Sequence, residues 1–181
     1  MRVIAGRWRG RPLAAPPGAA TRPTADRVRE ALFSMLASRL GGFDGLHVAD
    51  LFAGTGALGL EALSRGAAHC VFVEHDRAAL DALRRNVAAL GAAADVLASP
   101  VSALGPARRP NDLLLFDPPY GSGGAGALLE RLTRLGWAAP SAIASIETGP
   151  GETTSAEGWA VLAERGHGKA RLTLLRRQPA P

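Results

Sequence analysis

The segment Asp117-Pro118-Pro119-Tyr120 carries the clearest chemical signal in the 181-residue chain. It directly follows the apolar run Leu113–Phe116, and two consecutive prolines cannot continue a sheet ladder, so they fix a rigid turn. This turn leaves the Asp117 side chain and the Pro118 carbonyl as hydrogen-bond acceptors, with the ring of Tyr120 one step beyond. The exocyclic amine of a nucleobase offers two N–H donors beside a flat face. The segment therefore predicts a site that holds such an amine and orients its lone pair for attack.

A glycine-rich loop lies upstream of this segment. Residues 50–59 read DLFAGTGALG, and the G-x-G-x-x-G within them permits a tight turn and close approach of the backbone to a ligand. Glu74 follows at a spacing typical of an acid that accepts hydrogen bonds from ribose hydroxyls. Asp50 would repel a pyrophosphate but suits a cationic ligand. Because S-adenosylmethionine carries a sulfonium and an ammonium but no phosphate, the loop favours this cofactor over a dinucleotide.

Positive charge is concentrated near the N-terminus. The chain has 20 arginines, one lysine and a net charge of +5, and residues 1–29 hold seven of the arginines and a single acid, Asp26. Arginines around an aromatic ring are typical of segments that bind RNA phosphates and stack on unpaired bases. A solvated tail is the alternative for the segment, and a core anchor is the alternative for its tryptophan. The residues predicted to bind RNA are Arg7, Trp8, Arg9, Arg11 and Arg22.

Strands and helices are predicted to alternate along most of the chain. The segment up to Pro23 is interrupted by prolines and is predicted to contain a short strand at 2–5. A helix capped by Thr24 is predicted to follow and to extend to about residue 40. Apolar patterning predicts strands at 46–51, 70–74, 95–98, 113–116 and 142–147, helices at about 57–65, 77–90 and 125–136, a helical turn after Pro100, and a closing hairpin of 159–163 and 171–175. Such alternation is typical of a mostly parallel sheet with helices on both faces, which binds its ligand at the carboxyl ends of the strands.

Several of these segments resemble one family. Residues 2–11 (RVIAGRWRGR), 21–33 (TRPTADRVREALF) and 50–66 (DLFAGTGALGLEALSRG), together with residues 117–120, are similar to the RsmD family of bacterial 16S ribosomal RNA (guanine-N2)-methyltransferases. The likeness extends in order from about residue 2 to residue 177. It implies an α/β fold, a Rossmann-like class I S-adenosylmethionine-dependent methyltransferase. Its seven-stranded sheet would be mostly parallel, with one antiparallel strand near the edge and a short basic N-terminal hairpin arm.

The resemblance also implies a function and a division of the chain. Residues 1–23 would form the RNA-contacting arm and residues 24–181 the methyltransferase domain. The substrate would be N2 of one guanine in 16S rRNA, within a partly assembled small subunit, and we expect the protein to be a monomer. The expected catalytic residues are Asp117, Pro118, Pro119 and Tyr120. The expected cofactor-binding residues are Thr24, Asp50, Phe52, Ala53, Gly54, Thr55, Gly56, Glu74, His75 and Ser99.

Two features depart from the family's pattern. Where many such enzymes have an aspartate near the adenine amine, this chain has Ala98-Ser99-Pro100, which leaves that contact to Ser99 or to backbone groups. The loop after Tyr120, Gly-Ser-Gly-Gly-Ala-Gly, has no basic residue. We therefore expect this loop to contribute flexibility rather than phosphate contacts.

Three other classes of protein stay open: an adenine-N6 DNA methyltransferase, a non-catalytic RNA-binding assembly factor, and a dinucleotide oxidoreductase. No apolar run approaches the roughly 18–20 residues that span a bilayer, and no secretory signal is present, so we expect a cytoplasmic protein. Cys70 is the one cysteine, which excludes an internal disulfide. The four histidines have no metal-ligand spacing, so no metal is expected.

Overall fold

One seven-stranded sheet organises the structure, a computed structural model that describes residues 1–16, 23–119, 121, 124–149, 151–167 and 170–179. The strand order is β3-β2-β1-β4-β5-β7-β6. The strands β1 to β5 pair in parallel, whereas β7 is antiparallel to both β5 and β6. The predicted fold class is therefore confirmed. The strands are β1 (His47–Leu51), β2 (His69–Glu74), β3 (Ala94–Ala98), β4 (Asn111–Phe116), β5 (Ala138–Thr148), β6 (Trp159–His167) and β7 (Ala170–Arg177).

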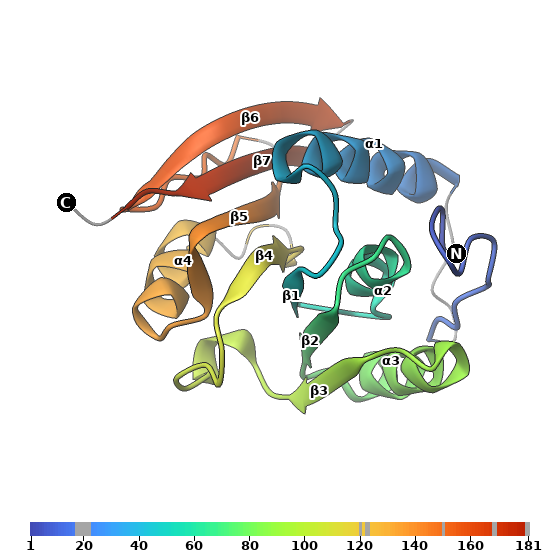
Figure 1. The fold of residues 1–181 in the computed structure, drawn as a ribbon. Helices are drawn as coiled ribbons and strands as arrows, with labels where there is room; N and C mark the ends of the chain where they lie inside the picture. Colours follow the sequence, from blue (N-terminus) through green and yellow to red (C-terminus); the bar gives the residue numbers. More distant parts are fainter. Residues whose placement is uncertain (17–22, 120, 122–123, 150, 168–169, 180–181) are drawn as a thin grey trace.

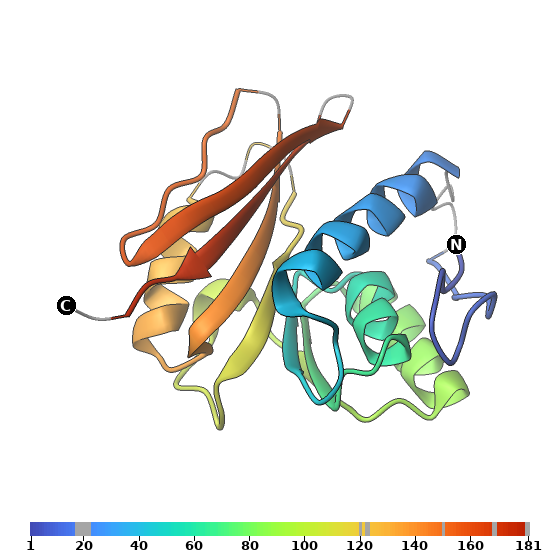
Figure 2. The same cartoon turned by 45° about the horizontal axis from the view of Figure 1, so that its top comes forward.

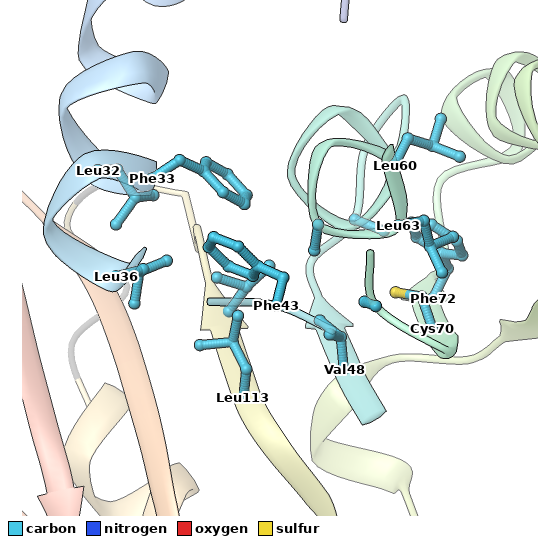
Figure 3. Packing of buried hydrophobic residues seen from close by; sticks show 14 of the residues in the cluster. Leu32, Phe33, Leu36, Phe43, Val48, Leu60, Leu63, Cys70, Phe72 and Leu113 are labelled. Carbon is cyan, nitrogen blue, oxygen red and sulfur yellow. The ribbon is translucent and has the colours of Figure 1, made fainter. Parts of the chain in front are cut away.

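Helices cover both faces of this sheet (Figures 1 and 2). One face carries α1 (Pro23–Leu40), α2 (Ala57–Ser64) and α3 (Arg77–Leu90), and the other carries α4 (Ala125–Arg134) and the short helix η1 (Val101–Ala103). Each face has its own apolar core. Figure 3 shows the core beneath α1 and α2, where Phe33, Phe43 and Leu63 are among the labelled side chains. No helix of the described part of the chain is long and apolar enough to cross a membrane.

Strand β4 is buried on both faces. Leu113 and Leu115 belong to the core beneath α1 and α2, whereas Leu114 and Phe116 belong to the core beneath α4. A continuous apolar run is typical of such a strand. The strand order reverses between β1 and β4, because β2 and β3 follow β1 on one side while β5 follows β4 on the other. This position is the topological switch point of the sheet. The carboxyl ends of β1 and β4 therefore flank the point at which open α/β sheets bind ligands.

Two local predictions about the N-terminal region are wrong. No strand forms at 2–5; only an isolated bridge joins Arg2 to Pro12, because the backbone N–H groups of Ile4 and Ala5 donate to a side chain of α2 instead. Thr24 does not cap α1, since the helix already begins at Pro23. Proline suits a first helical position because its φ is fixed and the N–H it lacks would have had no partner there.

Candidate active site

Four acidic side chains lie at the carboxyl ends of four adjacent strands. Asp50 is on β1 and Glu74 on β2, while Asp117 directly follows β4 and Glu147 is on β5. The parallel register of β4 and β5 sets Asp117 beside Glu147. The sheet therefore gathers the three acids that the sequence singled out, and it adds Glu147 to them.

Asp50 is almost completely buried, with 1% of its surface exposed. Its Oδ2 atom accepts a hydrogen bond of 2.8 Å from the backbone N–H of Gly59, and its Oδ1 atom has no hydrogen-bond partner among the described residues. Burial raises the pKa of Asp50 to about 8, against the effect of the Gly59 hydrogen bond, and the charges of Asp117 and Glu74 raise it further. Asp50 thus has little surface for a ligand, keeps its proton at neutral pH, and supports the site by holding the start of α2.

This burial gives a pH-dependent cost in stability. The free energy of unfolding should fall from about pH 4 to pH 8, because unfolded Asp50 ionises near 3.8 while folded Asp50 keeps its proton to about pH 8. Asp50→Asn removes this titration, so we expect the variant to lose less stability over that interval, by up to about 5 kcal/mol. Urea unfolding at about pH 4 and pH 8 measures this change in the free energy of unfolding. Asp95→Asn, at a side chain that is 59% exposed, is the matched control and should follow the wild type. Equal losses in the wild type and Asp50→Asn would contradict the prediction.

The glycine loop between β1 and α2 has an unusual backbone. Gly54 and Gly56 have φ values of 54° and 82°, and a Cβ atom on Gly56 would lie 2.5 Å from Cδ1 of Leu83. Phe52 has a φ of 69°, the one positive value among the described non-glycine residues. A bulky residue in this conformation is strained, and such strain is typical of functional loops. The backbone N–H of Ala53 donates to Val73 on β2, which fixes the loop to the neighbouring strand.

Glu74 holds that loop with its carboxylate. One oxygen accepts from the backbone N–H of Gly54 at 2.8 Å, and the other accepts from His75 at 2.7 Å and Asp76 at 2.8 Å. An ionised carboxylate has about four acceptor sites, so about one remains for a ribose hydroxyl, whereas the sequence led us to expect contacts to two. The imidazole of His75 is exposed 3.6 Å from this carboxylate. Ser99 also lies next to Glu74, because the backbone N–H of Ser99 donates to the backbone carbonyl of Glu74.

The charge of the site fits a cationic cofactor. Asp117 and Glu74 are close enough to Asp50 for their charges to raise its pKa. Among the described residues, no arginine forms an ion pair with these three. A pyrophosphate would be repelled here, whereas the ammonium and sulfonium of S-adenosylmethionine would be attracted. Within the described residues, no three His, Cys, Asp or Glu side chains gather as a metal site.

Asp117 is an ionisable acceptor at the mouth of the site. Asp117 is accessible to solvent, while Pro118 beside it is buried. The surrounding protein shields the carboxyl from water and raises its pKa to about 7, and the negative charge of Glu147 contributes to the shift. Tyr120, the predicted stacking ring, lies outside the described residues. The carboxyl of Asp117 can therefore accept hydrogen bonds and exchange a proton near neutral pH.

The described part of the N-terminal arm (residues 1–23) packs along α2. Arg7 stacks 4.2 Å from the centre of the Trp8 ring, and that ring is partly buried against the core. The structure therefore gives Trp8 a packing role while leaving an arginine on its ring. Arg9 and Arg11 are exposed, and Arg11 donates to a backbone carbonyl of α3. Arg22 and the side chain of Thr24 lie outside the description.

Two residues that the sequence analysis missed anchor the arm. Glu61 of α2 is fully buried, and its carboxylate accepts from the N–H groups of Ile4 and Ala5 at 2.7 and 3.0 Å. Asn86 of α3 exchanges two hydrogen bonds with Ala14 and donates a third to the carbonyl of Thr55 in the glycine loop. Both are polar residues on otherwise apolar helix faces, and that pattern is the signal that would have found them. Glu147 had a signal as well, since it ends a predicted strand.

This order of strands, with β7 alone reversed, is the fold of the class I S-adenosylmethionine-dependent methyltransferases, and the acidic strand-end site agrees with their cofactor. The magnesium protoporphyrin IX methyltransferase of Synechocystis, solved with bound S-adenosylmethionine, shares this fold at a TM-score of 0.62. That structure is 16% identical, and the match covers 89% of this chain and 87% of that one.

Sequence comparison gives the family. The family model described as Conserved hypothetical protein 95 matches residues 1–176. Ribosomal RNA small subunit methyltransferase D of Escherichia coli strain K12 is 38% identical over 182 residues, which cover 98% of this chain and 90% of that protein. The solved structure of the Escherichia coli protein yhhF has a TM-score of 0.88 and 38% identity, with 99% of each chain covered. The chain belongs to this family, the RsmD family that its sequence resembles.

Proposed function

We propose that this protein transfers the methyl group of S-adenosylmethionine to the exocyclic N2 amine of a guanine in 16S ribosomal RNA. The observation that carries the proposal is the position of Asp117, which β4 sets at the switch point of the sheet beside a negatively charged cofactor site. The Escherichia coli relative is named for methyl transfer to small-subunit ribosomal RNA, and the choice of guanine N2 follows from the RsmD resemblance.

The turn after β4 would prepare the amine for attack. The Asp117 carboxylate and the Pro118 carbonyl accept its two N–H bonds, which orients the nitrogen lone pair and favours the pyramidal form. S-adenosylmethionine, when bound, supplies an electrophilic methyl group on a good leaving group. As the amine gains the methyl group it becomes positive, and Asp117 stabilises that charge. A pKa of about 7 lets an Asp117 oxygen take the proton that the amine then loses. Pro119 keeps the turn rigid, and Tyr120 stacks on the base.

The cofactor would lie across the carboxyl ends of β1, β2 and β3. The glycine loop holds its methionine end, Glu74 accepts from its ribose with His75 nearby, and Ser99 or backbone groups contact its adenine. The segment around Thr24 covers it from the other side. The loop residues in this proposal are Asp50, which holds the start of α2, and Phe52, Ala53, Gly54, Thr55 and Gly56.

The ionisation of Asp117 should appear in the pH profile. With both substrates below saturation, we expect the rate to rise about tenfold per pH unit below pH 7 and to level off above it, because the protonated carboxyl loses an acceptor. Asp117→Asn keeps one acceptor oxygen without a titration, so its slower reaction should lack this step. Initial rates of methyl transfer from labelled cofactor between pH 5.5 and 8.5 provide the test. A level wild-type profile would contradict the role given to Asp117.

We further propose that the substrate is a partly assembled small subunit, that residues 1–23 contact its RNA, and that the protein acts as a monomer. Methyl transfer from labelled S-adenosylmethionine should be compared on assembly intermediates and mature subunits that lack the modification, on their deproteinised rRNA, and on duplex DNA. Incorporation into the intermediates at the highest kcat/KM supports the proposal. Preference for duplex DNA would favour an adenine-N6 DNA methyltransferase, and cofactor binding without any transfer would favour an assembly factor. Sedimentation measures the oligomeric state.

A further inference from the structure

A polar cavity lies between the N-terminal arm and the first turns of α1. Its volume is about 510 Å³, which is within the usual range of ligand pockets. A Cβ atom on Gly10 would meet no atom within 4 Å, so this part of the arm leaves room for a bound group. We call it the arm–helix cavity; its polar and glycine lining is Arg2, Arg9 and Gly10 from the arm and Asp26, Arg27 and Glu30 from α1.

Two charged residues of this cavity, Asp26 and Arg2, already form contacts within the protein. Arg29, a buried residue of α1, donates to the Asp26 carboxylate at 3.0 Å and to the backbone carbonyl of Arg2. The guanidinium of Arg2 lies 3.9 Å from the other Asp26 oxygen. These contacts neutralise Asp26 and tie the arm to the helix, so Asp26 is part of the frame of the cavity.

The other three charged side chains have no polar partner among the described residues. Arg9, Arg27 and Glu30 are exposed, and none has an ion pair or side-chain hydrogen bond with another described residue. Two guanidinium groups attract a phosphate, which they can hold by paired hydrogen bonds. The free carboxylate of Glu30 would repel a simple anion and instead needs a ligand that brings N–H donors. A nucleotide with a donor edge meets both requirements, and guanine presents two neighbouring donors, N1–H and the N2 amine, to a single carboxylate.

The first residues of the arm connect this cavity to the glycine loop of the proposed cofactor site. The Met1 sulfur lies 3.5 Å from the hydroxyl of Thr55 in the glycine loop, and the next residue, Arg2, lines the cavity. The cavity and the glycine loop therefore both lie beside the first two residues of the arm. Building on the proposed function, we infer that the arm–helix cavity binds a second nucleotide of the RNA substrate, a guanine. Its phosphate contacts Arg9 and Arg27, and its donor edge contacts Glu30.

Nucleotide titration of the labelled protein tests the inference without requiring methyl transfer. Guanosine, cytidine, adenosine and uridine 5′-monophosphates and inorganic phosphate are added to ¹⁵N-labelled full chain saturated with S-adenosylhomocysteine. We expect the guanosine nucleotide to shift the amide signals of Gly10 and Arg27 and to bind there at least about tenfold more tightly than the uridine nucleotide. Glu30→Gln should abolish that preference and leave the Kd for S-adenosylhomocysteine unchanged. Glu164→Gln, at an exposed acid of β6, is the matched control and should keep the preference.

Three outcomes would overturn the inference. Shifts confined to Asp117 and Glu147 would place the nucleotide in the target site alone. Equal affinity for the four nucleotides, or for inorganic phosphate, would make the cavity a phosphate site without base recognition. A preference for guanosine that survives in Glu30→Gln would remove the role of this carboxylate. Because Glu30 is exposed, the variant should fold, and its unfolding transition verifies this.

Discussion

Replacing Asp117 by alanine should lower kcat for methyl transfer by about 100- to 1000-fold and leave the Kd for S-adenosylhomocysteine within about threefold. The variant loses the one ionised acceptor that the turn offers to the target amine. Removing one preorganised group that stabilises transition-state charge typically costs this much. The Kd should change little because the glycine loop and Glu74, which are proposed to hold the cofactor, keep their backbone hydrogen bonds.

Single-turnover rates and calorimetry separate these two quantities. Asp95→Asn on β3 is the matched control, since Asp95 is exposed and its one ion pair with a described residue is with His69, at the opposite end of the sheet. It should retain both the rate and the Kd of the wild type. An unchanged kcat in Asp117→Ala would contradict the role of the turn. A loss of cofactor binding equal to the loss of rate would make Asp117 a cofactor residue instead.

Replacing Glu61 by alanine should lower the free energy of unfolding by about 3 kcal/mol or more. The carboxylate is fully buried and accepts three hydrogen bonds, two from the arm and one of 2.8 Å from Nε of Arg65. Its removal leaves the N–H groups of Ile4 and Ala5 without partners. Because the arm is then loosened, we also expect KM for RNA to rise about tenfold or more while the Kd for S-adenosylhomocysteine changes less.

Urea unfolding and steady-state kinetics measure the two effects of the Glu61 substitution. Glu61→Gln keeps one acceptor oxygen and should fall between the wild type and Glu61→Ala, which keeps the test open if the alanine variant does not fold. Glu164→Gln again serves as the exposed control and should match the wild type. If Glu61→Gln loses RNA and cofactor binding equally, the arm would be structural rather than a contact for RNA.

The parallel core of the fold was predictable because its signals are local. The apolar run before Asp117 ends at two prolines, so both the strand and its end could be assigned from sequence. Strand β5 was predicted to begin at residue 142 because Pro140 and the exposed Ser141 interrupt the apolar pattern. The strand in fact begins at Ala138. The pairing of β4 with β5 shifts register near this point, which accommodates the interruption.

The N-terminal arm was less predictable because its conformation depends on distant residues. Val3 and Ile4 are residue types typical of a strand, yet the backbone N–H groups of Ile4 and Ala5 donate to the carboxylate of Glu61. Gly6 shows the same dependence. Its φ is 82°, and a Cβ atom there would lie 1.9 Å from the carbonyl oxygen of Ser64, so only glycine permits this close approach to α2. Neither the partner nor the contact can be read from the local sequence.

The candidate site was predictable in position but not in the state of its side chains. Strand ends correctly indicated that Asp50, Glu74 and Asp117 lie together, because parallel strands share one carboxyl edge. The burial of Asp50 and the hydrogen bond from the Gly54 N–H to Glu74 arise only when the glycine loop folds against β2. Glu147 joins the site through β5, which contacts β4 only in the folded sheet.

The most direct test of the proposed chemistry is to identify the methylated nucleoside. Small-subunit 16S rRNA that lacks the modification is incubated with the protein and isotopically labelled S-adenosylmethionine, digested to nucleosides and separated by mass spectrometry. We expect one labelled product, N2-methylguanosine, that forms at least about 100-fold more slowly with Asp117→Ala and at the wild-type rate with Asp95→Asn. Label in N6-methyladenosine or in any other nucleoside, or N2-methylguanosine formed equally by Asp117→Ala, would contradict the assignment of this site to guanine N2.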